Sequence, residues 1–370
     1  MEQEVHENSN TTLAAPSLEA GTIMSSQKRS KSYWDSVFVG HTLKLSPHGW
    51  DFTNNKGPSQ LYFKSSDLID YINKKSLRRF NCKTISFDEC DFNGEFTSEI
   101  SKHEISFGKC NFTKCDFGGS VWKGVKFSEC KFERCSFTMA EFQDCIFYEC
   151  EWIDITLSGT ETKMPNTLVS NPAKFIGAAY TNLDKNILRR NSKTPGYQKM
   201  RLEGTKAKFS RTLLKNAENH GDDDAYYGAV QTYLNQSLRS KIQKSMYEFI
   251  YGKGFVGHGM NFLAAYFELF LLNISGFVNC WGKSIARPAI IGIALTFAFG
   301  LVYGFISNDY QRGLVQGFDI TFLVGYTKYA GTTNPNPIHI ELLYGVNAFF
   351  GLWWYAVLVP TLINRISRVN

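Results

Sequence analysis

An aromatic residue returns at every fifth position through much of the first half of this chain, and few folds accept that spacing. Steps of five reach, in order, Phe87, Phe92, Thr97, Lys102, Phe107, Phe112, Phe117, Trp122, Phe127, Phe132, Phe137, Phe142, Phe147, Trp152 and Leu157. A second column lies two residues earlier, from Ile85 to Ile155, and is filled mostly by cysteine and other small or apolar residues. A period of five matches neither an α-helix, at about 3.6 residues, nor a strand, at about 2, so it indicates a repeat architecture.

The pattern over residues 82–160 resembles the pentapeptide-repeat family, whose motif has a central Phe or Leu and a small residue two positions before it. The resemblance implies a right-handed quadrilateral β-helix, in which four pentads make one coil and both columns point inward. Fifteen pentads would then form just under four coils. Each coil can bury its aromatic residues only against the neighbouring coils, as in other solenoids.

The cysteines of the repeats are interpreted as part of this inner packing. By their spacing, Cys90, Cys110, Cys130 and Cys150 are expected to stack on one face, and Cys115 and Cys135 on another. Zinc sites use CxxC pairs or Cys/His clusters, whereas this region contains only His103. We therefore expect the thiols to act as small buried hydrophobes, with no metal or cofactor, in a reducing cytoplasm.

Composition and turn signals divide the chain into several segments, so we expect a multi-domain protein. The expected segments are a disordered tail (1–33), an N-terminal cap of the β-helix (34–81), the repeats (82–160), an α-helical hairpin linker (172–251), an interfacial helix (261–281) and a membrane domain (285–370). The N-terminus has no apolar signal-peptide segment, and the cysteines number nine, so an exported disulfide framework is not expected.

Charge differs between the segments. The repeats between Ile85 and Leu157 carry 14 acidic and 7 basic side chains, although the whole chain has a net charge of +6. The helical hairpin at 172–251 has the opposite balance, with 14 basic and 7 acidic residues. This basic surplus could meet anionic lipid head groups or the acidic repeats.

The turn of the helical hairpin is predicted at His220–Gly221. Gly221 suits the C-terminal cap of the first helix, and one of Asp222 to Asp224 suits the N-cap of the second. A metal site at these three aspartates is the alternative, although carboxylates at a helix start are also favoured by the helix dipole alone.

Two apolar stretches, 285–306 and 340–363, are each long enough to cross the roughly 30 Å hydrocarbon core of a bilayer. The flanking basic residues are Lys283 and Arg287 near the start of the first stretch, and Arg365 and Arg368 after the second. The positive-inside rule therefore places both ends of this pair, and the repeats with them, in the cytoplasm.

A third apolar stretch, at 261–281, contains Glu268, Asn273 and Asn279. We expect it to lie along the membrane interface. A third span is the alternative, and it would place the two ends of the protein on opposite sides of the membrane.

The segment between the two spans, SNDYQRGLVQGFDITFLVGYTKYAGTTNPNP, resembles the loop of two-helix, potassium-channel-like pore domains. Bacterial proteins that fuse pentapeptide repeats and a helical hairpin to such a pore share this order of segments. The resemblance implies a re-entrant loop, with a pore helix starting at Phe318–Asp319 and a filter followed by Pro335. The candidate pore-loop residues are Phe318, Asp319, Val324, Gly325, Tyr326, Thr327, Lys328, Tyr329, Gly331 and Thr332.

The filter departs from the family pattern. Val324–Gly325–Tyr326 matches its centre, but Thr327–Lys328 replaces the Gly-Asp that follows; alternatively, residues 327–332 form a degenerate filter. Potassium filters need glycines in left-handed conformations so that backbone carbonyls replace the hydration shell, and Lys328 would repel cations. The sequence therefore predicts a pore hairpin without potassium selectivity.

These features favour a homo-oligomeric, channel-like protein of a bacterial inner membrane, tetrameric by resemblance, with both termini cytoplasmic. The solenoid would serve sensing or assembly, and the architecture suits a stress or anti-phage effector. The alternative is a membrane-anchored scaffold whose acidic β-helix binds a cytoplasmic protein without ion conduction.

Two other classes of function are not favoured. Some acidic pentapeptide-repeat proteins mimic DNA, but the basic C-terminal half argues against this role, and we expect no nucleic-acid partner. The sequence contains no GxSxG, HExxH or P-loop motif, so we expect no catalytic residues and no enzyme activity.

Overall fold

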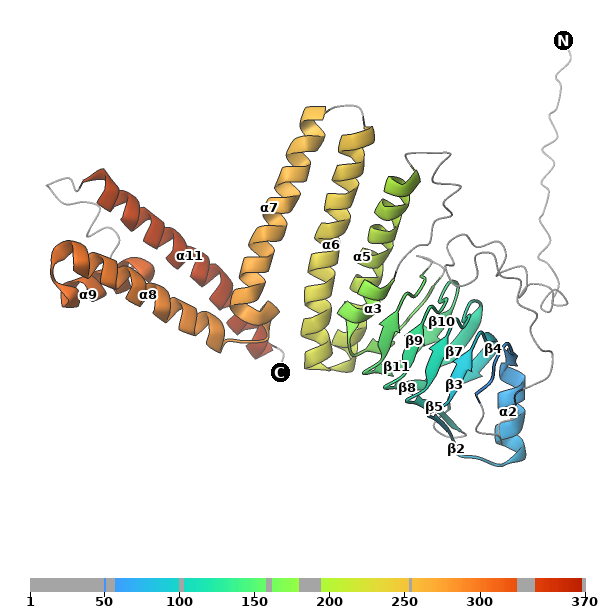
Figure 1. The fold of residues 1–370 in the computed structure, drawn as a ribbon. Helices are drawn as coiled ribbons and strands as arrows, with labels where there is room; N and C mark the ends of the chain where they lie inside the picture. Colours follow the sequence, from blue (N-terminus) through green and yellow to red (C-terminus); the bar gives the residue numbers. More distant parts are fainter. Residues whose placement is uncertain are drawn as a thin grey trace, which may run out of the picture. The chain divides into compact units, whose positions relative to one another are not determined.

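The computed structural model describes residues 50, 57–99, 103–157, 162–179, 194–252, 255–324 and 337–367. These residues belong to two compact units, one containing residues up to 167 with 177–195, the other containing 168–176 and residues from 196 onwards. The first unit is formed mainly of stacked strands and the second mainly of helices (Figure 1).

The first unit is a β-solenoid of about four turns. Its strands are β1 (Tyr62–Lys64), β2 (Arg79–Lys83), β3 (Ser86–Asp88), β4 (Asp91–Thr97), β5 (Glu104–Gly108), β6 (Asn111–Thr113), β7 (Ser120–Lys123), β8 (Lys126–Ser128), β9 (Lys131–Glu133), β10 (Glu141–Gln143), β11 (Ile146–Tyr148) and β12 (Glu151–Ile153). Parallel sheets run in the orders β1-β4-β7-β10, β2-β5-β8-β11 and β3-β6-β9-β12. A row of parallel bridges, Asp91–Asp116–Ser136–Thr156, provides the fourth face. The predicted β-solenoid is confirmed.

The inward column of the repeat forms continuous aromatic stacks. Phe112 lies between Phe87 and Phe132, with ring centroids 4.8 and 4.9 Å apart, and Phe132 stacks on Trp152 at 4.6 Å. The solenoid rings of this stack are buried, as the motif requires. Stacking at these distances gives each ring a contact with the coil on either side, in addition to its burial from water.

The first coil is longer than the sequence pattern suggests. Phe87 pairs with Phe112, 25 residues later, whereas Phe112 pairs with Phe132, 20 residues later. Phe96, and not the expected Thr97, takes the inward position, where it stacks on Trp122 at 4.0 Å. The extra residues precede β5, where Glu99 and His103 form an antiparallel bridge.

This longer coil corrects one prediction about the cysteines. The predicted stack of Cys90 on Cys110 is wrong, because Cys90 lies against Cys115. Cys110 instead contacts Cys82, with 3.8 Å between the sulfurs. An insertion of one pentad preserves the five-residue period but moves every following pentad to the next face of the solenoid.

The buried thiols also pair with the backbone. The Sγ of Cys135 donates to the carbonyl oxygen of Phe112 at 3.2 Å, and the Sγ of Cys145 donates to that of Trp122 at 3.3 Å. Burial raises the pKa of the Cys115 thiol and raises that of Cys145 to about 12. Buried cysteines in the small-residue position are therefore packing residues and weak hydrogen-bond donors.

The corners of the solenoid use left-handed backbone conformations at non-glycine residues. Positive φ angles of 51–57° recur in steps of five at Thr84, Glu89, Lys109, Lys114, Glu129, Arg134, Asp144, Glu149 and Asp154. Such angles cost about 1–2 kcal/mol per residue outside glycine, so the coil-to-coil hydrogen bonds and aromatic stacks must offset them.

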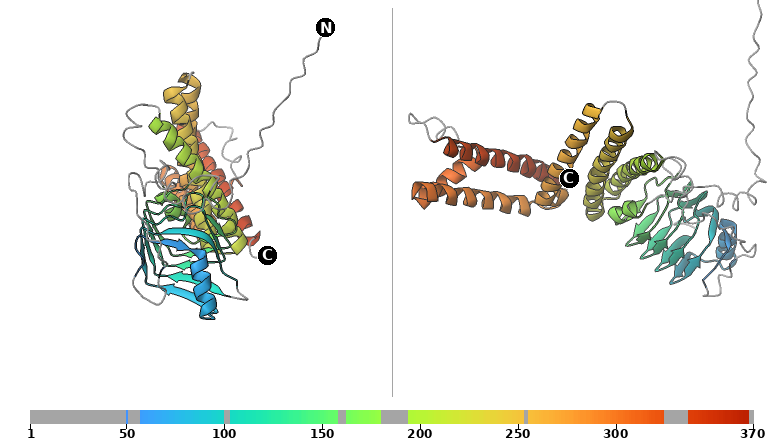
Figure 2. Two further views of the ribbon diagram at one scale, coloured as in Figure 1. Left: turned by 90° about the vertical axis from the view of Figure 1, so that its right-hand side faces the viewer. Right: turned by 45° about the horizontal axis from the view of Figure 1, so that its top comes forward.

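Helix α2 (Ser65–Lys74) lies at the N-terminal end of the solenoid, where it buries Leu68 and Ile72 (Figure 2). The Oγ of Ser65 accepts a hydrogen bond from the backbone N–H of Glu95 at 3.0 Å. Gly94, with φ of 98°, permits this close approach, because a Cβ there would overlap the Ser65 hydroxyl.

The second unit contains β13 (Leu168–Val169), most of α3 (Pro172–Ala178), and the helices α5 (Thr194–His220), α6 (Asp223–Tyr251), α7 (Phe255–Asn279), α8 (Ala286–Ser307), α9 (Tyr310–Thr321) and α11 (Ile338–Ser367). Gly221 has φ of 67° between α5 and α6, and the carboxylate of Asp222 accepts from the Ala225 N–H at 3.0 Å. The predicted caps at Gly221 and Asp222 are therefore confirmed.

Replacement of Phe117 by Ala should destabilise the solenoid by about 3–5 kcal/mol. Phe117 is fully buried and stacks between Phe92 and Phe137, at 4.8 and 5.0 Å. Tyr148, which is 49% exposed, offers a matched aromatic control whose replacement by Ala should cost under about 1 kcal/mol. Denaturant unfolding of the full chain in detergent, followed by circular dichroism, would measure both; equal losses would contradict the buried stack.

The thiols should react with a maleimide in two classes. Eight cysteines are buried in the solenoid, and only Cys280 is partly exposed. Because burial keeps the reagent from the solenoid thiols, the native chain should take up one label at neutral pH, whereas the denatured chain should take up nine. Mass spectrometry counts the labels, and rapid native labelling of any solenoid cysteine would contradict the inert-packing interpretation.

Candidate functional site

Three helices are long and apolar enough to cross a membrane, which indicates a membrane protein. The candidate spans are Gly259–Gly282, Ala286–Ser307 and Ile338–Ser367. In an 18-residue apolar window of each helix, only 17%, 22% and 28% of the residues are buried within the chain. Helices in the core of a soluble protein would bury far more of such apolar surface, so these helices require an apolar surrounding of another kind.

Two of these helices, α8 and α11, pack antiparallel to each other. Near one end of the pair, Tyr303 contacts Tyr344 with ring centroids 5.4 Å apart. Near the other end, the Nε1 of Trp354 donates to the carbonyl oxygen of Pro288 at 2.6 Å. The sequence between them adds a third, shorter helix to this pair.

Helix α9 folds back along α8 through four glycines. A Cβ at Gly313 would overlap the backbone of Gly304, and one at Gly317 would lie 2.7 Å from the nitrogen of Gly300. Both helices therefore carry a Gly-xxx-Gly pair, spacing that lets two helix backbones approach closely in a membrane. The contacts run in opposite directions along the two helices, so α9 is antiparallel to α8.

The C-terminal end of α9 shows how far this helix extends along α8. Gly317 faces the carbonyl oxygen of Thr296, which lies at the middle of α8. With 12 residues, α9 is about 18 Å long, too short to cross a hydrocarbon core of about 30 Å. It therefore covers only one half of α8 and ends beside its centre.

A buried polar network connects α9 to the other two helices. Asn347 of α11 is fully buried; its Oδ1 accepts from the Thr321 hydroxyl at 2.8 Å, and its Nδ2 donates to the Tyr303 hydroxyl at 3.2 Å. The Nε2 of Gln316 also donates to the hydroxyl of Tyr344 at 2.7 Å. Polar side chains at such positions are commonly functional or specify how helices pack in a membrane.

The predicted start of the pore helix at Phe318–Asp319 is wrong. The helix begins at Tyr310, and the two residues lie in its last turns. The carboxylate of Asp309 caps it by accepting from the Arg312 N–H at 3.0 Å, after Asn308 ends α8 in a left-handed conformation. An aspartate at the N-cap is an ordinary sequence signal for the start of a helix.

The candidate pore-loop residues are only partly described. Phe318 lines an apolar groove of about 310 Å³ between α8 and α9, together with Ile293, Thr296, Phe297, Leu314 and Phe322. Asp319 is half-buried, and Val324 is exposed. The other candidates, Gly325, Tyr326, Thr327, Lys328, Tyr329, Gly331 and Thr332, lie outside the described residues.

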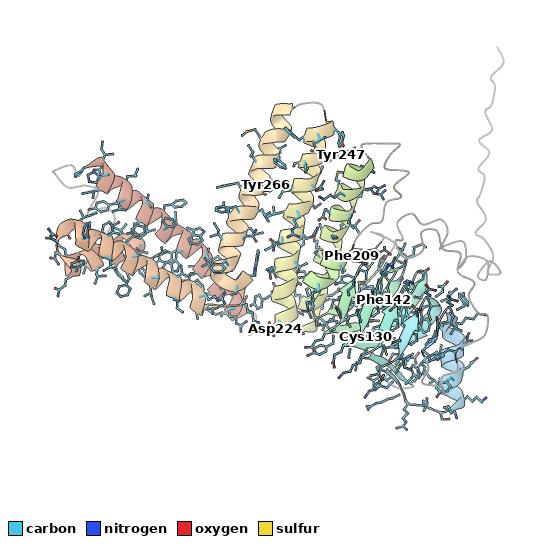
Figure 3. All side chains as sticks on the ribbon, in the orientation of Figure 1. Cys130, Phe142, Phe209, Asp224, Tyr247 and Tyr266 are labelled. Carbon is cyan, nitrogen blue, oxygen red and sulfur yellow. The ribbon has the colours of Figure 1, made fainter. Side chains whose placement is uncertain are left out.

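The acidic start of α6 contacts the ends of the two helices. Asp224, labelled in Figure 3, accepts from the Nζ of Lys283 at 2.6 Å. This hydrogen bond lowers the pKa of the Asp224 carboxyl. Asp223 lies 3.6 Å from the guanidinium of Arg365, which also lies over the Tyr227 ring. These aspartates, considered above as a metal site, form ion pairs with the residues that flank α8 and end α11.

Replacement of Gly313 by Ala should force α9 away from α8, because its Cβ has no space against the Gly304 backbone. We expect a loss of about 1–3 kcal/mol, seen as a lower thermal unfolding midpoint of the full chain in detergent. Gly345→Ala is the matched control, since no atom lies within 4 Å of its added Cβ. That variant should keep or raise the midpoint, and an equal fall in both variants would contradict the close packing.

Comparison with known protein families agrees with the structure of the first half. Residues 107–151 match the model of pentapeptide repeats. Comparison with curated proteins gives no match. This chain therefore contains a pentapeptide-repeat β-solenoid, followed by helices that are long and apolar enough to cross a membrane.

Proposed function

We propose that the C-terminal helices form a channel-like pore in an oligomer of this chain. Helices α8 and α11 cross the bilayer, and α9 is a re-entrant helix that enters from the side opposite the solenoid. The observation that supports this proposal is the placement of α9, which packs backbone to backbone on α8 and ends beside its middle.

A helix that ends inside a membrane leaves polar backbone groups that need hydrogen-bond partners. Its last carbonyl groups have no partners within the helix, and hydrocarbon offers none, so the chain that follows must be buried in protein or line a water-filled space. In this protein the following residues are the candidates from Val324 to Thr332. Packing of α9 by glycines and by the Asn347 network is the support that such a segment needs.

The charges near this point would govern which ions pass. The C-terminal end of α9 carries the negative pole of the helix, and Asp319 lies close to that end. Both favour cations at mid-depth, whereas Lys328, nine residues further along, disfavours them. The pore is therefore proposed to conduct with weak selectivity rather than to select potassium.

Oligomerisation is part of the proposal because a single hairpin cannot enclose a pathway. The resemblance to two-helix pores suggests four copies. Basic residues at the ends of the spans and the buried thiols of the solenoid support a cytoplasmic location of the solenoid and both termini. The resemblance to bacterial fusion proteins suggests a bacterial inner membrane. The solenoid would act in sensing or assembly, in a stress or anti-phage role.

The second candidate function is a membrane-anchored scaffold whose solenoid binds a protein. Cross-coil ion pairs Lys114–Glu89, Lys123–Glu95 and Lys126–Glu104 join neighbouring coils and neutralise part of its acidic surface. Tyr148 and Met139 are its exposed large apolar residues among those described, at 49% and 43%. If the solenoid binds a partner protein through this surface, the membrane helices would serve only as an anchor.

Purified full-length protein in liposomes should pass ions, and its mass in detergent should be a multiple of the chain mass. Asp319→Asn should reduce the permeability ratio of cations to anions several-fold, and Lys328→Ala should raise it, because each removes one charge beside a narrow aqueous path with low-dielectric walls. Glu341→Gln, an exposed carboxylate in the first turn of α11, is the control and should leave the ratio unchanged.

A monomer without conductance under any ionic condition tested would rule out the channel and leave the scaffold. If conductance is present but neither charge variant alters selectivity, Asp319 and Lys328 do not line the pathway.

A further inference from the structure

The polar helix α6 runs along the full length of the apolar helix α7. The two are antiparallel: the ring of Phe249 contacts Gly259, Lys241 forms an ion pair with Glu268 at 2.6 Å, and Tyr227 reaches Gly282 beyond the end of α7. Figure 3 labels Asp224 and Tyr247, which lie towards opposite ends of α6, and Tyr266 on α7. Whatever position α7 takes in a membrane, α6 must share it.

Helix α6 is unsuited to a bilayer interior. Charged side chains occur along its middle and end, at Arg239, Lys241, Lys244 and Glu248. On another side it is joined to α5 by a hydrogen bond from Gln236 to Glu203. Charges and polar groups on a lipid-exposed helix are costly at the centre of a membrane, so α7 cannot cross while α6 lies against it.

The outer face of α7 is nevertheless apolar. Met260, Leu263, Phe267, Phe270 and Phe277 are 59–75% exposed and follow the spacing of one helix face. Ala265 is fully buried on another face of the same helix. A helix with one face packed on polar α6 and an exposed apolar face on the other side is typical of helices that lie on a membrane surface.

The turn between α7 and α8 supports a change of direction at the membrane surface. Cys280, Trp281 and Gly282 have φ angles of 49°, 60° and 96°, which break the helix within three residues. The Trp281 ring lies on Gly276, where a Cβ would come within 2.5 Å of it. Tryptophan is favoured at the interface of a bilayer. The apolar helix α8 begins at Ala286, just beyond this turn.

We infer that α7 lies along the cytoplasmic surface of the bilayer. Its exposed apolar residues would lie at the boundary between head groups and acyl chains, with anionic lipid head groups beside α6. The side chains of Lys241 and Lys244 on α6 are 52% and 67% exposed. In this placement their ammonium groups, which pair with Glu268 and Glu248, would also contact the head groups. The inference rests on the proposed crossing of α8 and α11, but not on ion conduction. Its consequence is an even number of spans, with both ends of the protein on one side.

Cysteine labelling in proteoliposomes tests this topology. In a Cys280→Ser background of the full chain, single cysteines replace Gly252 at the α6–α7 turn, Gln311 at the start of α9 and Ser367 at the end of α11, all exposed residues. A membrane-impermeant maleimide should label positions 252 and 367 from the same side and position 311 from the other.

Each deviation has a separate meaning. Labelling of 252 together with 311, opposite 367, would overturn the surface placement and make α7 a third span. Labelling of 311 and 367 from the same side would instead overturn the crossing of α8 and α11, and with it the proposed function.

The lipid contact has its own test with spin labels in the same background. Phe267→Cys, at the middle of α7, should report a shallow depth, whereas Phe297→Cys, exposed near the middle of α8, should report a deep one. Equal depths would overturn the surface placement. Exchange of phosphatidylglycerol for phosphatidylcholine should raise water access at position 267, and an unchanged value would overturn the role of anionic lipid.

Discussion

The contact between the backbones of α8 and α9 determines the arrangement of the C-terminal helices. Gly304 meets Gly313 and Gly300 meets Gly317 with no room for a side chain, so α9 can take only one register along α8. That register brings Thr321 to the buried Asn347 of α11, and the resulting hydrogen bonds hold all three helices together. Because lipid provides no hydrophobic drive between helices, close packing and internal hydrogen bonds must supply the stability here.

The solenoid solves a similar problem by other means. Each coil satisfies its backbone and its aromatic rings through the coil before and the coil after, so the two ends need covering. Helix α2 lies at the first end, with Leu68 and Ile72 buried. The recurring left-handed corners are costly outside glycine, but charged residues at these positions can reach the next coil, as Lys114 does to Glu89 at 3.0 Å.

The sequence predicted the solenoid because a strict period leaves few alternatives, but the period alone did not determine which pentads share a face. Cys90 was placed wrongly because the longer first coil keeps the phase of five while it rotates every later pentad by one face. Hydropathy predicted the lengths of α8 and α11, but it does not distinguish an α7 that crosses a membrane from an α7 that lies along its surface. The spacing of the glycines at 300, 304, 313 and 317 is visible in the sequence and is typical of close helix packing. The partners of Asn347 depend on how the helices pack, so its role does not follow from the sequence alone.

The start of α6 contacts both α8 and α11 at once. Lys283, just before α8, contacts Asp224, and Arg365, at the end of α11, contacts Asp223 and the ring of Tyr227. These pairs are exposed and individually weak in water, so their effect depends on acting together at one helix end. Since α9 contacts both α8 and α11, a displacement of the first turn of α6 would reach α9 through two helices and not one. Such a connection transmits a change only if the helices have two stable arrangements. The balance between those arrangements would then depend on the ion pairs at the start of α6.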